Sequence, residues 1–348
     1  MAAFLPGGNN TFVPSHEASN KLVVDFARSP KSFALADYTQ IVKVKNRVGY
    51  YQKMNIDEAG RVMNDEGNEY NWADGEVAPG GRAGTREHEY KPFLCVRKAF
   101  PFTLGQQAVG QATWDIVAAH ARTHAQKAMT VRTMKAVKVA TTTGNHLSTH
   151  VIDISALSGN TGTWAASTTA RMNIKRSINT MIQRILDDTL AAVDVDDFRL
   201  VINSTLAQQI SECQEIVDYI KGSPDALDQI KGELRRSNPN AQFGLPDNLY
   251  GVKLCVEKTR KVTSKRRATS AKSQVLATAT PFMVARPGGL EGVAGTPSFS
   301  AITAFMYEEM TTETKRDADN RLTSGRVVED YDMVLTAPEA AGMFQNAV

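Results

Sequence analysis

The stretch EKTRKVTSKRRATSAK, residues 257–272, is the one local charge signal of the sequence. After its first residue, the stretch holds basic side chains and no acidic one. The basic residues are Lys258, Arg260, Lys261, Lys265, Arg266, Arg267 and Lys272. Runs of this kind bind the phosphates of nucleic acids. No aromatic residue is interleaved, so the run does not indicate base stacking. A solvated loop and a contact with a polyanion both remain consistent with it.

A second group of cations lies in the segment Leu104–Ala140, which lacks proline and is rich in helix-forming residues. Arg122, Lys127 and Arg132 belong to this group, and Asp115 is the only acidic residue of the segment. The cations do not gather on one face of a helix, which argues against a single docking surface.

Histidines and aspartates offer little catalytic or metal-binding chemistry. His120 and His124 are four residues apart on the expected helix and could share a metal ion. Surface histidines are the preferred interpretation, because only Asp115 lies near them in sequence. His146 and His150 are a weaker pair, and the aspartate-rich VDVDD lacks the glycine of an EF-hand loop. Nucleotide-binding, metalloprotease and hydrolase motifs are absent from the sequence. We therefore expect no enzyme, no metal and no cofactor.

Composition sets the broad class of the protein. The chain has 348 residues, 42% of them hydrophobic and 22% charged, with a formal net charge of +3. These values are typical of a globular protein with ample core, and the small net charge confines any nucleic-acid contact to local patches. Three widely spaced cysteines indicate buried free thiols. No apolar run reaches the length of a membrane span, so we expect synthesis in the cytoplasm and no membrane contact.

The segment NEYNWADGEVAPGGRAGTREHEYK, residues 68–91, has few side chains to bury. It lies between two strand-like segments, the first marked by alternating apolar residues from Val42 to Met54. An arm this polar cannot offset its ordering entropy of about 1–2 kcal/mol per residue by folding on itself. We therefore expect it to become ordered against a second copy of the chain. The expected contact residues are Trp72, Val77, Arg82, Arg86 and Glu87.

The centre of the chain predicts helices packed around a small sheet. Between Thr169 and Ala192, apolar residues recur at helical spacing from Ile174 to Ile185. A buried strand DDFRLVIN, a helix capped by Ser204 and a strand GVKLCVEK follow. Further on, FSAITAFMYEEMTTETKRD and RLTSGRVVEDYDMVLTA read as long strands joined at DADN. The fold class expected is α+β.

The order of these parts resembles the major capsid protein of tailed bacteriophages, whose shell-forming fold is shared with encapsulins and the herpesvirus capsid floor. The segments that carry the resemblance are DFRLVINSTLAQQI, LYGVKLCVEK and GRVVEDYDMVLTAPEAAGMFQ. The resemblance implies an N-terminal arm, an extended two-stranded loop, a peripheral domain with a long spine helix and an axial α/β domain. Its expected boundaries are 1–45 for the arm, 46–92 for the loop, 93–168 and 285–348 for the peripheral domain, 104–140 for the spine helix, and 169–284 for the axial domain.

By the same resemblance, the chain is expected to assemble with itself into hexamers and pentamers of an icosahedral capsid that encloses double-stranded DNA. Its location would be the virion capsid, with portal, scaffolding or decoration proteins as further partners. The basic residues named above would be candidates to face the genome. No lysine–asparagine pair can be assigned, so no covalent cross-link is expected. Two alternatives stay open: an encapsulin-like compartment with protein cargo, and a nucleic-acid-binding protein that uses residues 258–272.

Overall fold

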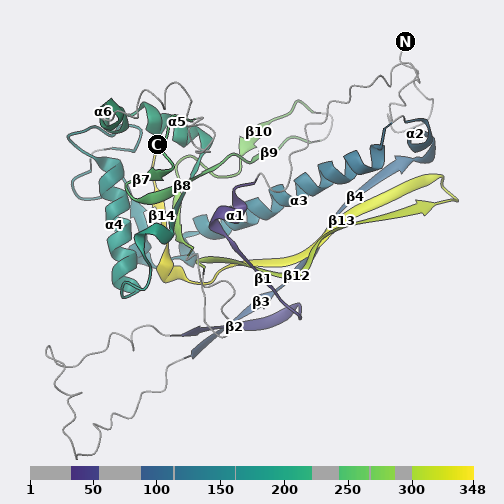
Figure 1. Cartoon of the computed structure of the whole chain (residues 1–348), viewed down its shortest axis with the longest axis horizontal. Coiled ribbons are helices and arrows are strands. Elements are labelled where there is room, and N and C mark those ends of the chain that lie inside the picture. Colours follow the sequence, from purple (N-terminus) through teal and green to yellow (C-terminus); the bar gives the residue numbers. More distant parts are fainter. Residues whose placement is uncertain are drawn as a thin grey trace, which may run out of the picture.

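The computed structural model describes residues 33–54, 88–112, 114–160, 162–221, 243–265, 268–286 and 300–348. Two sheets organise these residues, each with its own helices (Figure 1). A long helix, α3, lies alongside a pair of long strands, β12 and β13 (Figure 1).

The larger sheet has six strands in the order β5-β14-β11-β6-β8-β7. Their bounds are Val151–Asp153 for β5, Ala341–Gln345 for β14, Phe282–Ala285 for β11, Phe198–Asn203 for β6, Val252–Glu257 for β8 and Asn248–Leu249 for β7. β6 and β8 are parallel, whereas β11 is antiparallel to both of its neighbours. The short apolar runs of β6, β8 and β11 are almost continuously buried, as strands covered on both faces must be.

Helices and short turns surround this six-stranded sheet. Their bounds are Leu35–Tyr38 for α1, Thr143–Asn145 for η4, Ser148–His150 for η5, Asn173–Asp188 for α4, Val195–Asp197 for η6, Ser204–Glu212 for α5, Gln214–Lys221 for α6 and Pro338–Ala340 for η9. The apolar spacing predicted for α4 is confirmed, because Ile174, Ile178 and Ile185 are fully buried. α5 begins where Asn203 accepts a hydrogen bond from the backbone N–H of Leu206.

The smaller sheet has four strands in the order β1-β12-β13-β4. Their bounds are Gln40–Lys43 for β1, Ile302–Asp317 for β12, Leu322–Leu335 for β13 and Val96–Gly105 for β4. The two long strands predicted from the sequence are confirmed as the antiparallel pair β12–β13. α3 packs on β13, β4 and β12.

The long helix is shorter than the segment Leu104–Ala140 predicted. Leu104 and Gly105 end β4, a short helix α2 covers Gln106–Gln111, and α3 covers Ile116–Thr141. α3 starts at Asp115 because its carboxylate accepts a hydrogen bond of 2.9 Å from the backbone N–H of Ala118. Helix propensity alone does not predict the interruption between Gln111, where α2 ends, and Ile116, where α3 begins.

Two further pairs of strands complete the described part. β2, Val48–Met54, pairs with β3, His88–Leu94, to form a hairpin, and β9, Arg260–Val262, pairs with β10, Lys272–Gln274, to form a ribbon. Figure 1 shows the hairpin beneath β12 and β13. The sequence also predicts helices at SHEASNKLVVDFAR, residues 15–28, and SPDALDQIKGELRR, residues 223–236, and both lie outside the described residues.

β5 and β14 fall within the ranges 93–168 and 285–348 expected for the peripheral domain, and both strands belong to the six-stranded sheet. β14 lies between β5 and β11, so it is an interior strand of that sheet. The three cysteines are free and buried, as the sequence predicted.

Candidate assembly surface

The β2–β3 hairpin has one covered face and one open face. Pairing places Val48 opposite Leu94, Tyr50 opposite Pro92 and Gln52 opposite Tyr90, so these side chains share one face. On that face Val48 is 60% exposed, Tyr50 69%, Tyr90 62% and Leu94 55%. We call Val48, Tyr50, Tyr90, Pro92 and Leu94 the outer face of the hairpin. Contiguous exposed apolar side chains of this kind mark interaction sites.

The other face of the hairpin packs on the four-stranded sheet. The ring of Phe93 stacks on Phe305 at 4.4 Å between centroids, and the ring of Tyr51 stacks on Phe305 at 5.6 Å. Gly49 lies opposite Phe93, and a Cβ at Gly49 would come within 2.6 Å of that ring. Glycine is therefore required at this position for the ring to lie across the hairpin.

Polar contacts hold the root of the hairpin in place. The backbone N–H of Leu94 donates to Asp332 at 3.1 Å, and that of Cys95 donates to Arg47 O at 2.8 Å. Arg47 in turn forms a 2.8 Å ion pair with Asp330, whose side chain is fully buried. The hairpin therefore leaves the sheet in a fixed direction.

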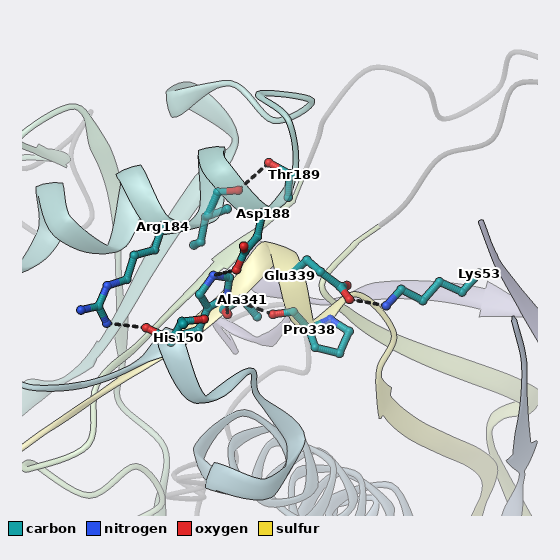
Figure 2. Close-up of polar contacts among 10 residues, drawn as sticks. Lys53, His150, Arg184, Asp188, Thr189, Pro338, Glu339 and Ala341 are labelled. Atoms are coloured by element: carbon teal, nitrogen blue, oxygen red, sulfur yellow. Dashed lines mark hydrogen bonds and ion pairs between the residues drawn. The ribbon is translucent and has the colours of Figure 1, made fainter. Parts of the chain in front are cut away.

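A chain of contacts also ties the hairpin to α4 (Figure 2). Lys53 at the far end of β2 forms an ion pair with Glu339 of η9. Next to Glu339, the Nδ1–H of His150 donates to Ala341 O at 2.9 Å. The Nε2 of the same buried ring lies 2.8 Å from the carboxylate of Asp188 at the end of α4. The hairpin is thus coupled to the six-stranded region through η9 and His150.

The histidines otherwise have structural partners. His146 lies in the core, where its Nε2 bonds to Ala140 O at 2.7 Å, and burial lowers its pKa. His124 donates from Nδ1 to His120 O at 2.8 Å, and its ring lies against Phe102. Desolvation also lowers the pKa of His120. Within the described ranges, no three His, Cys, Asp or Glu side chains converge as metal ligands.

Arg132 is a correction to the predicted set of surface cations. It is buried beneath α3, where its guanidinium forms an ion pair with the fully buried Glu329. Desolvation raises the pKa of Glu329 despite this partner. Arg132 therefore cannot face a nucleic acid in this fold.

Lys98 and Lys135 border the same buried charges. The Nζ of Lys135 lies 2.7 Å from Asp332, and the Nζ of Lys98 lies 3.3 Å from the centre of the Tyr331 ring. Burial, together with the charge of Lys135, lowers the pKa of Lys98 to about 8.

The remaining predicted cations are divided between α3 and the ribbon. Arg122 and Lys127 of α3 are both exposed, at positions that do not share one face of the helix. On the ribbon, Arg260 is exposed, Lys261 is half-buried and Lys265 follows in the exposed turn. Lys258 precedes the ribbon with its Nζ 5.4 Å from the centre of the Phe243 ring. The basic segment 258–272 therefore forms part of the β9–β10 ribbon and is not simply a loop.

Several predicted residues lie outside the described part of the chain. These are Trp72, Val77, Arg82, Arg86, Glu87, Arg266 and Arg267. The outer face of the hairpin was not among the predicted contact residues. The alternation of Val48 and Tyr50 marked the strand, but it could not show that the apolar side would lack a cover.

Several solved structures are similar to the structure of this chain. A phage-related protein from Bordetella bronchiseptica matches with a TM-score of 0.61 and 13% identity, over 92% of this chain and 93% of its own. The mature capsid of bacteriophage PhiM1 matches with a TM-score of 0.54 and 11% identity, over 99% and 91%. The capsid of cyanophage P-SCSP1u matches with a TM-score of 0.57 and 10% identity, over 94% and 90%. The chain therefore has the α+β fold of tailed-phage capsid proteins.

Sequence comparison adds no closer assignment. No protein-family profile matches the chain, and no curated protein matches its sequence. None of the helices in the described ranges is both long and apolar enough to cross a membrane.

Proposed function

We propose that this chain is a structural shell protein, which assembles with copies of itself into hexamers and pentamers of an icosahedral capsid. The observation that carries the proposal is the outer face of the hairpin. Four large apolar side chains there, at Val48, Tyr50, Tyr90 and Leu94, are each more than half exposed in the single chain. Burial of such side chains stabilises an interface by about 25 cal/mol per Å² removed from water. The shared fold with the capsids of PhiM1 and P-SCSP1u supports the same conclusion.

The hairpin is positioned to present this face to another copy. Its inner face is fixed by the stack of Phe93 and Tyr51 on Phe305, and its end by Lys53 and Glu339. A preorganised surface binds with a smaller entropic cost than a loose one. The polar segment between β2 and β3, with Trp72, Val77, Arg82, Arg86 and Glu87, would continue the same contact over the neighbouring subunit.

The direct test is a triple variant of the outer face, Val48→Ser/Tyr50→Ser/Leu94→Ser. We expect particles to disappear from electron micrographs of the purified protein, while the free energy of unfolding changes by no more than about 0.5 kcal/mol per site, because the side chains already face water. The matched control is Leu190→Ser/Val195→Ser/Val262→Ser, which removes exposed apolar side chains elsewhere. The control should still form particles. Particles from the triple variant, or equal loss in the control, would contradict the proposal.

Double-stranded DNA is the proposed content of the shell, and the virion capsid the proposed location. The support is the exposed cationic set of Arg122, Lys127, Arg260 and Lys265, together with Lys258 and Lys261. Nuclease protection of DNA in purified particles tests the content. Protected long DNA supports the capsid, whereas a co-purifying enzyme without DNA would support the encapsulin-like alternative. Portal, scaffolding or decoration proteins remain proposed partners, to be sought in the same particles.

A further inference from the structure

The solvent face of α4 carries cations that belong neither to the basic residues described above nor to the outer face of the hairpin. Lys175, Arg176, Asn179, Thr180, Gln183 and Arg184 follow one another at helical spacing along this face. Together with Met172 they line a shallow groove that is largely open to solvent. We call the six residues the α4 stripe. None of the described residues that line the groove is acidic.

The two arginines of the stripe are held in place without losing their charge. Arg176 donates to Gly159 O, and Arg184 donates to Thr149 O. Figure 2 shows the Arg184 side chain extending from α4 to this carbonyl. A guanidinium has five N–H donors, so a bond to one carbonyl leaves most of them for a ligand. Neither arginine forms an ion pair with another described residue.

The chemistry of the stripe favours phosphate over other partners. Arginine, lysine and amide side chains donate to phosphate oxygens, and arginine does so in a bidentate manner. The groove has no aromatic lining residue on which an unpaired base could stack. Its one apolar lining residue is Met172, and the groove holds neither of the aromatic anchors, Trp and Tyr, that are enriched at the centre of protein interfaces.

The stripe is long enough to reach several phosphates of a duplex. Arg176 and Arg184 are eight residues apart, or about 12 Å along a helix that rises 1.5 Å per residue. One strand of duplex DNA carries a phosphate about every 3.4 Å of axis, and its phosphates are farther apart along the strand itself, so the three cations of the stripe can each reach one phosphate. We propose that the α4 stripe binds the phosphate backbone of double-stranded DNA without reading its sequence. The inference deepens the proposed function, because it assigns a genome contact to the six-stranded region.

The test compares a stripe variant with a matched control, both as full chains. The stripe variant is Lys175→Gln/Arg176→Gln/Arg184→Gln, in which glutamine keeps one donor for the carbonyl bonds. The control, Lys45→Gln/Lys315→Gln/Arg316→Gln, removes three positive charges at exposed positions of the peripheral region. Binding of a fluorescent 30-base-pair duplex is followed by anisotropy at several salt concentrations.

We expect the stripe variant to bind more weakly and its salt dependence to become shallower. Each phosphate contact contributes about 0.9 to the slope of log K against log salt, so three contacts contribute about 2.7. The control should keep the wild-type slope, and Lys175→Arg/Arg176→Lys/Arg184→Lys should restore it. Thermal unfolding checks that all variants fold.

Three results would overturn the inference. One is an unchanged affinity and slope in the stripe variant, and the second is an equal loss in the control. The third is a stripe variant that binds DNA normally but no longer forms particles, which would make the stripe a contact between copies. Electron microscopy of the wild-type chain separates the two proposals. If it forms no particles, the proposed function fails, while the slope still decides the DNA contact.

Discussion

The six-stranded sheet and the peripheral region, which comprises the four-stranded sheet and the β2–β3 hairpin, distribute their side chains in opposite ways. In the six-stranded sheet, Leu200, Val201 and Ile202 of β6 and all of β11 are fully buried, and apolar residues form the core. In the peripheral region, the charged Glu329 and Asp330 are fully buried, whereas Val48 and Leu94 are more than half exposed. Among the described residues, the first region buries its large strand side chains within one chain. The second leaves apolar surface open, where the proposed contacts between chains would cover it.

The largest effect is expected where the peripheral region buries charge. Arg132→Met leaves Glu329 without its ion-pair partner in a fully buried position. Removal of one member of such a pair costs about 3–5 kcal/mol. Chemical denaturation should show this loss in the free energy of unfolding.

The double variant Arg132→Met/Glu329→Leu is the control for that prediction. Replacement of a buried pair by apolar side chains of similar size is often neutral. The double variant should therefore recover most of the stability. If Arg132→Met were as stable as the wild type, Glu329 would have to be solvated or protonated. The peripheral region would then not bury a charge that depends on an ion-pair partner.

The next effect lies in the six-stranded sheet. A Cβ at Gly342 of β14 would overlap the sulfur of Met181 and come within 3.1 Å of His150 O. Gly342→Val should therefore destabilise the chain by about 1–3 kcal/mol through overpacking, measured as a lower melting temperature. Gly144→Val is the matched control, because nothing lies within 4 Å of a Cβ there. Equal melting temperatures for both variants would show that the sheet is looser than its burial indicates.

The smallest effect concerns Lys98 and depends on pH. Its pKa is lowered from 10.5 to about 8 in the folded chain, chiefly by burial. Between these two values the unfolded chain binds more protons at Lys98, so stability rises with pH in this window and is lost as pH falls through about 8. Lys98→Met should remove this component and raise the melting temperature at pH 7. Parallel pH profiles for the two proteins above pH 8 would contradict the prediction.

Regular patterns made much of the six-stranded region predictable. The spacing from Ile174 to Ile185 gave α4, and the apolar run of β6 gave its buried strand. β14 was missed because AGMFQ is short, contains glycine and does not alternate. Its position in the sheet depends on neighbours that are distant in sequence.

The peripheral region was harder to predict because its residues are placed by tertiary contacts. In the sequence, Arg132 looks like a cation on the solvent-facing side of a helix. Its burial becomes evident only from its ion pair with Glu329, which is distant in sequence. The exposure of Val48 and Tyr50 could not be predicted either. Alternation of apolar and polar residues indicates that one face of a strand is apolar. It does not indicate whether residues of the same chain pack on that face.

The place of β14 in the sheet order constrains when this chain can fold. β5 and β11 are both synthesised before β14, yet β14 is the strand that joins them. Until the ribosome has made residues 341–345, β5 has no partner and β11 has one open edge. The six-stranded region can therefore close only late in translation. A nascent chain carries the hairpin residues before it carries Phe305 and Asp332, which hold the hairpin on the sheet. The hairpin is therefore fixed in place only when the subunit is nearly complete.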